Sequence, residues 1–155
     1  EPNGQLAQGG VTGYEGGVVS QAGIVINYDD RNNVIYPTKG SLVEMVYTSN
    51  SKKIGSDFDF SRIRLNAATY FAATTNHVVA LNLFGDFVSG DPPFNEMALL
   101  GGGRQLRGYY EGRYRDNNLI LFQAEYRMAL FQNIQKARWK WLKRFKIAFL
   151  EDMVL

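Results

Sequence analysis

The sequence contains no cysteine, and this absence excludes disulfides, thiolate metal sites and cysteine nucleophiles. Its single histidine, His77, has no Ser/His/Asp arrangement and no metal-ligand spacing around it, so we expect no enzyme, no metal and no cofactor. The net charge is only +2, which argues against a nucleic-acid partner. No apolar run approaches the roughly 18 residues that a membrane-spanning helix needs, and residues 1–4 lack the basic and apolar blocks of a signal peptide.

Aromatic residues and glycine are abundant instead. Phe 10, Tyr 9 and Gly 16 accompany a hydrophobic share of 45%, and this balance favours sheet over helix. Apolar and polar residues alternate in several segments that are bounded by Gly, Asn, Asp, Pro or Ser, and a period of two is typical of strands with two different faces. The expected strands are residues 22–29, 41–49, 58–71, 77–87, 118–131 and 145–153.

The alternation is clearest in residues 120–130. Apolar side chains from Ile120 to Leu130 occupy one face of that segment, and Gln123, Glu125 and Arg127 occupy the other. Each clear segment is close to the roughly 9 to 11 residues that a tilted strand needs to cross a bilayer. A soluble barrel would alternate in the same way with its apolar face inside, so the pattern alone leaves a membrane barrel and a soluble β protein equally open.

The connections between the expected strands differ in length. Residues 74–76 form a short turn, whereas residues 89–117 form a long connection with a Gly triplet at 101–103 and many Arg and Tyr residues. Short turns at one end and long loops at the other are the asymmetry of outer-membrane barrels. A loop of that length is expected to be functional or disordered. Residues 1–17 show no period and are expected to be loop as well.

Two motifs are more specific than the alternation. Residues 101–109 read Gly-Gly-Gly-Arg-Gln-Leu-Arg-Gly-Tyr, and the strand that follows contains Gln-Ala-Glu-Tyr-Arg at 123–127. Upstream, Asp-Asp at 29–30 precedes Tyr-Pro-Thr-Lys-Gly at 36–40. In this order the two motifs resemble those of the bacterial surface-antigen barrels, the BamA and TamA group of outer-membrane proteins. The resemblance covers about residues 23–152 of the chain.

The resemblance implies a role for each motif. In that family a long extracellular loop folds back into the barrel lumen and carries an aliphatic-Arg-Gly-aromatic tip, here Leu106, Arg107, Gly108 and Tyr109. A lumenal arginine keeps its charge and needs a carboxylate, and the expected partner of Arg107 on the following strand is Glu125. The strand after that offers Glu151 or Asp152, and we expect Glu151. The upstream motif is implied to be a periplasmic turn that contains Asp29, Asp30, Pro37, Thr38 and Gly40.

The fold expected from these observations is all-β: an antiparallel transmembrane β-barrel segment, about six strands of a sixteen-stranded barrel, with a long lumen-inserted loop. Residues 1–155 would form a single partial barrel domain in the bacterial outer membrane, with 1–17 as loop and 89–117 as the long extracellular loop. The expected function is to insert outer-membrane proteins or to export polypeptides. Its expected partners are outer-membrane lipid, client polypeptides and periplasmic accessory proteins.

Two other interpretations stay open. The same barrel type, in autotransporter-like or two-partner secretion proteins, serves effectors such as patatin-like lipases, and a soluble β-barrel could instead carry small apolar ligands. A basic run at 136–146 interleaves Lys and Arg with Trp139, Trp141 and Phe145. We expect this run on the periplasmic side of the membrane interface, because Trp, Lys and Arg suit phospholipid headgroups.

Overall fold

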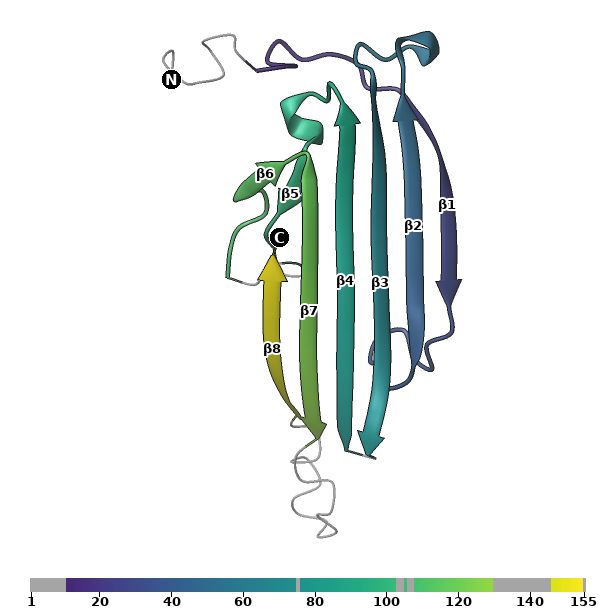
Figure 1. Cartoon of the computed structure of the whole chain (residues 1–155), viewed down its shortest axis with the longest axis vertical. Coiled ribbons are helices and arrows are strands. Elements are labelled where there is room, and N and C mark those ends of the chain that lie inside the picture. Colours follow the sequence, from purple (N-terminus) through teal and green to yellow (C-terminus); the bar gives the residue numbers. More distant parts are fainter. Residues whose placement is uncertain (1–10, 75, 103–104, 106–107, 130–145, 155) are drawn as a thin grey trace. The chain divides into compact units, whose positions relative to one another are not determined.

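The computed structural model describes residues 11–74, 76–102, 105, 108–129 and 146–154. Its main element is a six-stranded sheet in the order β1-β2-β3-β4-β7-β8, and a second sheet pairs β5 with β6. The arrows of the six strands point alternately up and down along this order, so neighbouring strands are antiparallel (Figure 1). The all-β, antiparallel fold that the sequence predicts is confirmed.

The long strands follow the alternating segments of the sequence. The bounds are Gln21–Asp29 for β1, Gly40–Asn50 for β2, Phe60–Thr74 for β3, His77–Gly90 for β4, Ala98–Leu100 for β5, Tyr114–Asp116 for β6, Asn118–Ala129 for β7 and Lys146–Val154 for β8. The described residues also include the single-turn 3-10 helices η2 at Lys52–Ile54 and η3 at Phe94–Glu96. The six predicted strands therefore all exist, although β3 begins and ends later, and β4 ends later, than expected.

The long connection between β4 and β7 contains more regular structure than the sequence predicts. It includes η3 and the β5–β6 pair, in which Ala98 lies opposite Asp116 and Leu100 opposite Tyr114. The Gly102 amide donates to the Tyr109 carbonyl at 2.9 Å beyond the ends of these strands. A period of two cannot be recognised in strands this short, which is why the sequence predicts only a loop here.

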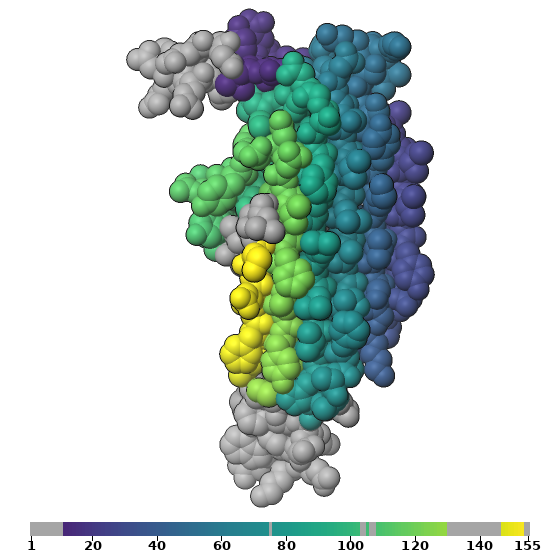
Figure 2. Space-filling model, in the orientation of Figure 1, coloured from purple at the N-terminus to yellow at the C-terminus, as the bar shows by residue number. Residues whose placement is uncertain are grey.

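The register between β7 and β8 decides which acids share a face. Gln123 pairs with Asp152, Ala124 with Glu151, and Glu125 with Leu150. Figure 2 shows the side chains of β8, in yellow, lying directly against those of β7, in green. Because side chains directly opposite one another in a sheet project to the same face, Asp152 lies on the face of Gln123 and Glu151 lies on the other.

The chain forms two compact units. Unit one comprises residues 1–26, 45–65 and 85–120, and unit two comprises residues 27–44, 66–84 and 121–155. Strands β1, β2, β3, β4 and β7 each contribute residues to both units. Each unit contains its own cluster of charged side chains.

Candidate functional site on the polar face of the sheet

Large apolar side chains lie on an exposed face of the sheet. Alternate positions of β3, β4 and β7 have substantial exposed fractions, with Ile63 at 41%, Phe71 at 55%, Leu83 at 40% and Phe122 at 41%. The positions between them include charged side chains, of which Asp86 is only 3% exposed, together with buried apolar side chains such as Val78 and Leu121. A soluble barrel would place its apolar set inside. The observed pattern instead fits a membrane barrel, in which the apolar set contacts hydrocarbon and the polar set faces the interior.

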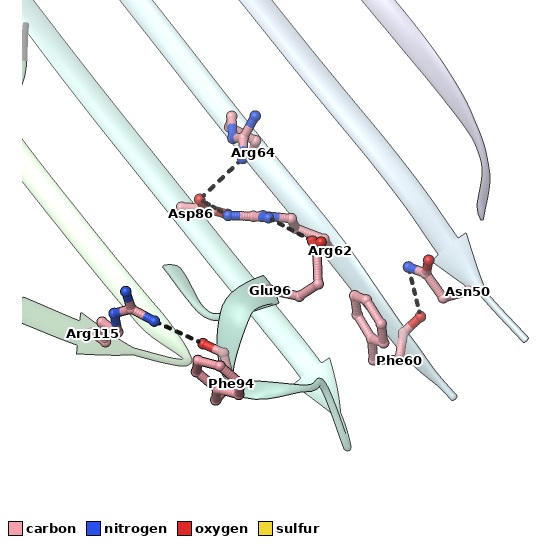
Figure 3. A network of polar contacts seen from close by, with 8 residues as sticks. All are labelled: Asn50, Phe60, Arg62, Arg64, Asp86, Phe94, Glu96 and Arg115. Atoms are coloured by element: carbon pink, nitrogen blue, oxygen red, sulfur yellow. Dashed lines mark hydrogen bonds and ion pairs between the residues drawn. The ribbon is translucent and has the colours of Figure 1, made fainter. Parts of the chain in front are cut away.

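Asp86 of β4 is the centre of the charged cluster in unit one. Its carboxylate accepts hydrogen bonds from Arg62 of β3 at 2.7 and 2.6 Å, and Arg64 Nη2 lies 3.5 Å from Asp86 Oδ2. Arg62 Nη1 also lies 3.7 Å from Glu96 Oε2 in η3. Figure 3 shows Arg62 between these two carboxylates. One arginine therefore connects two strands of the sheet to the beginning of the long connection.

Aromatic and arginine side chains gather around the β5–β6 pair. Arg115 Nη1 donates to the Phe94 carbonyl at 3.3 Å, and its guanidinium lies 5.9 Å from the centre of the Phe94 ring (Figure 3). Arg113 lies over the Tyr110 ring at 5.8 Å. Gly101 has φ +128°, and an added Cβ would lie 2.1 Å from the Tyr110 carbonyl oxygen, so this close approach requires glycine. The described residues of the long connection are thus linked to one another by contacts of their own.

A row of polar side chains crosses three strands in unit two. Asn82 Nδ2 of β4 donates to Gln123 Oε1 of β7 at 3.1 Å, and Gln123 Nε2 donates to Asp152 Oδ1 of β8 at 3.0 Å. Asp152 fixes the direction of this row, because an ionised carboxylate only accepts hydrogen bonds. The row presents the Asp152 carboxylate on the polar face.

Glu125 of β7 has an arginine partner on its own strand. Arg127 Nη2 donates to Glu125 Oε2 at 2.8 Å, and the exposed fractions of the two side chains are 16% and 18%. Arg127 Nη1 donates to the Pro37 carbonyl at 3.2 Å. Its guanidinium lies 5.1 Å from the centre of the Tyr36 ring and 5.7 Å from that of Tyr70. Arg127 therefore contacts β3 and the connection between β1 and β2 as well as its own strand.

The connection between β1 and β2, which we call the β1–β2 turn (residues 30–39), is organised by its own polar side chains. Asp29 accepts hydrogen bonds from the Arg31 guanidinium at 2.8 and 2.7 Å, and this interaction raises the pKa of Arg31 above its ordinary value. Asn32 Oδ1 accepts from the Thr38 amide at 3.0 Å, and Asn32 Nδ2 donates to Thr38 Oγ1 at 2.8 Å. Gly40 closes the turn with φ +96°, a conformation that favours glycine.

Comparison with known families identifies the chain at the level of a superfamily. The Omp85 superfamily domain matches residues 19–142. The chain belongs to the Omp85 superfamily. Omp85 proteins are β-barrels of the bacterial outer membrane that insert or translocate polypeptides together with accessory proteins, and they are generally not enzymes. The predicted relation to this group of barrels is confirmed at that level. No curated protein matches the chain.

Some of the predicted site residues of this Omp85 domain lie outside the described residues. These are Leu106 and Arg107 of the loop tip, so the pairing of Arg107 with a carboxylate stays a prediction. Gly108 has φ +94°, and the Tyr109 ring lies 6.0 Å from that of Tyr114. The basic run is also outside the described part of the chain up to residue 145.

The β7–β8 register changes the expected acid of β8. Asp152 shares the polar face with Gln123, whereas Glu151 pairs with Ala124 and lies on the face of the exposed apolar side chains. A shift of one residue moves a side chain to the opposite face of a strand. We therefore replace Glu151 by Asp152 as the expected partner of Arg107.

The predicted turn motif is brought together in space. Asp29 binds Arg31, the Asp30 carboxylate accepts from the Ser41 amide, and the carbonyl of buried Pro37 accepts from Arg127. Over the described ranges no helix is long and apolar enough to span a membrane. In the same part of the chain, no group of three or more His, Cys, Asp or Glu residues could hold a metal ion.

Sequence reasoning missed two features of the site. One is the ion pair of Arg62 with Asp86, and the other is the pair of tyrosine rings beside Arg127. The sequence signal for the ion pair was that Arg62 and Asp86 lie on the polar faces of consecutive predicted strands. For the second, only the family motif placed Tyr36 in a turn, and nothing placed that turn against β7.

Proposed function

We propose that this Omp85 chain is the barrel portion of a BamA-like or TamA-like protein that assists the insertion of other outer-membrane polypeptides. The observation that carries the proposal is the Asp152 carboxylate on the polar face, with neutral Gln123 as its described hydrogen-bond partner. Glu125 is already paired with Arg127, so Asp152 is the carboxylate best suited to receive a further arginine. That arginine is Arg107 at the tip of the long connection.

In this proposal the long connection, residues 89–117, lies inside the barrel lumen. Arg107 offers a planar fork of donors, and a carboxylate in a restricted lumen accepts such a fork at both oxygens. Gln123 holds Asp152 from the side at 3.0 Å and so limits the rotation of the carboxylate. The barrel performs no bond chemistry. Its wall opens between two strands, and a client strand pairs with the exposed backbone edge.

The proposal is tested with the full-length protein in lipid vesicles, by the rate at which an unfolded outer-membrane polypeptide acquires its folded, heat-modifiable form. Arg107→Ala and Asp152→Asn should slow this rate about tenfold, which corresponds to the roughly 1.4 kcal/mol of a charged hydrogen bond. Both variants should also expose residues 89–117 to protease. Glu151→Gln is the matched control, because Glu151 is adjacent to Asp152 but on the opposite face.

Two results would contradict the proposal. Equal folding rates in empty vesicles and in vesicles with the protein would remove insertion as its function. If Glu151→Gln and Asp152→Asn slowed insertion equally, the Asp152 carboxylate on the polar face would not be the group on which the function depends. Passage of an unfolded polypeptide into the vesicle interior without faster insertion would assign secretion instead, as in the two-partner systems.

A further inference from the structure

We infer that Arg127 is a positioning residue that holds the β1–β2 turn against the polar face of the sheet. The evidence is a set of contacts within unit two that join Arg127 of β7 to the Tyr36 ring and to the Pro37 carbonyl. Pro37 lies 90 residues away from Arg127 in sequence. The role of the turn inside a barrel rests on the proposed function. The attachment of the turn to Arg127 does not.

Arg127 uses both edges and the plane of its guanidinium. Nη2 donates to Glu125 and Nη1 donates to the Pro37 carbonyl. The rings of Tyr36 and Tyr70 lie 5.1 and 5.7 Å from the guanidinium carbon, within the range of cation–π attraction. Glu125 neutralises the charge, so the largely buried guanidinium is compensated while its second edge binds the turn.

These contacts require arginine rather than a general cation. A guanidinium has donors at fixed angles and a flat face that stacks on aromatic rings, whereas an ammonium is a point charge on a flexible stem. Lysine at position 127 could keep the ion pair with Glu125. It could not donate at the same time to the Pro37 carbonyl and lie flat beside Tyr36.

Hydrogen bonds within the β1–β2 turn should keep its own conformation when its contacts with the sheet are lost. Its polar side chains bond to one another, as Asn32 does with Thr38 and Asp29 with Arg31. The turn also contacts two strands beyond its own: Tyr36 and Pro37 contact Arg127 of β7, and Arg31 contacts Tyr70 of β3. Loss of the Arg127 contacts should loosen the turn at Tyr36 and Pro37 and weaken its attachment to the sheet, without unfolding its interior.

A fixed turn on the polar face has a consequence for an insertase or translocase. A segment held over the face that lines the lumen reduces the open cross-section there, and it prevents a polypeptide from lying along this part of β7. Arg127 would then determine which part of the polar face a client can reach.

The experiment uses trypsin, because Arg31 and Lys39 are cleavage sites within the turn. The full-length protein in lipid vesicles is treated briefly, and cleavage after these two residues is quantified by mass spectrometry. Arg127→Ala and Arg127→Lys should raise this cleavage rate about tenfold or more, while heat-modifiable migration stays that of the folded barrel. Arg127→Lys is decisive where Arg127→Ala lowers the yield of folded protein.

Tyr126→Leu is the matched control, because Tyr126 neighbours Arg127 on β7 and its side chain lies on the opposite face. Unchanged cleavage in Arg127→Lys, or an equal rise in Tyr126→Leu, would overturn the inference. Client insertion is measured on the same vesicles. Increased turn cleavage with unchanged client insertion would support the positioning role of Arg127 and show that the turn does not affect insertion. The positioning role and the proposed insertion function can therefore fail separately.

Discussion

Replacement of Arg62 by Met should destabilise the sheet because it leaves the Asp86 carboxylate buried without its main partner. The Asp86 side chain is 5% exposed, and Arg62 supplies its two short hydrogen bonds at 2.7 and 2.6 Å. The remaining cation is Arg64, whose Nη2 lies at 3.5 Å and whose side chain is 43% exposed. Met is similar in volume to the aliphatic stem of Arg, so the change removes charge with little loss of packing.

The magnitude follows from the burial of this pair. Removal of one partner of a buried ion pair costs about 3–5 kcal/mol. Arg64 can move closer and recover part of that loss, so we expect a decrease of about 2–4 kcal/mol in the free energy of unfolding. Arg62→Met combined with Asp86→Leu should cost much less than either change alone, because no charge is then left buried. Glu96→Gln should cost at most about 1 kcal/mol, because Glu96 is 3.7 Å from Arg62 and 32% exposed.

The assay is urea unfolding of the full-length protein from lipid vesicles, followed by tryptophan fluorescence and heat-modifiable migration. The two single variants, the double variant and Glu96→Gln form one series. The reasoning is refuted if Arg62→Met costs less than about 1 kcal/mol. It is also refuted if the double variant costs the sum of the two single variants, since contacting residues should not be additive.

Three further predictions test the face assignment and two turns. Leu83→Arg should make folding into a bilayer less favourable by about 2–4 kcal/mol, and a value near zero would show that this face does not contact lipid. Gly40→Ala should loosen the β1–β2 turn, because φ is +96° and a Cβ would lie 2.5 Å from a carbonyl oxygen; tryptic cleavage at Lys39 measures the effect. Gly101→Ala should raise protease cleavage within residues 89–117 for the same reason, and unchanged cleavage would contradict the close approach to Tyr110.

The long strands could be predicted because each repeats the alternation over many residues. β7 shows why: Leu119 and Leu121 are buried while Ile120 and Phe122 are exposed, and Gln123, Glu125 and Arg127 then continue the alternation of residue type. β5 and β6 contain three residues each, and beside this pair the backbone of Gly101 approaches that of Tyr110 closely. No local sequence pattern predicts the pairing of two strands that are so short.

The candidate site could be predicted only where one strand or one motif carries the information. Glu125 and Arg127 lie two positions apart on one strand, so their shared face follows from the sequence. The choice between Glu151 and Asp152 depends on the register with β7, which the sequence does not specify. The contact of Arg127 with the Pro37 carbonyl depends on the placement of a turn 90 residues away.

The two arginine and acid pairs of the site are independent only if each arginine has its own carboxylate. If Arg107 bound Glu125, it would compete with Arg127, and closure of the long connection would loosen the β1–β2 turn. If Arg107 binds Asp152, the two attachments coexist, because Asp152 is held by Gln123 and Glu125 by Arg127. Residues that share no partner have additive effects. Arg127→Lys and Asp152→Asn should therefore add in their effects on client insertion, and strong non-additivity would favour Glu125 as the shared acid.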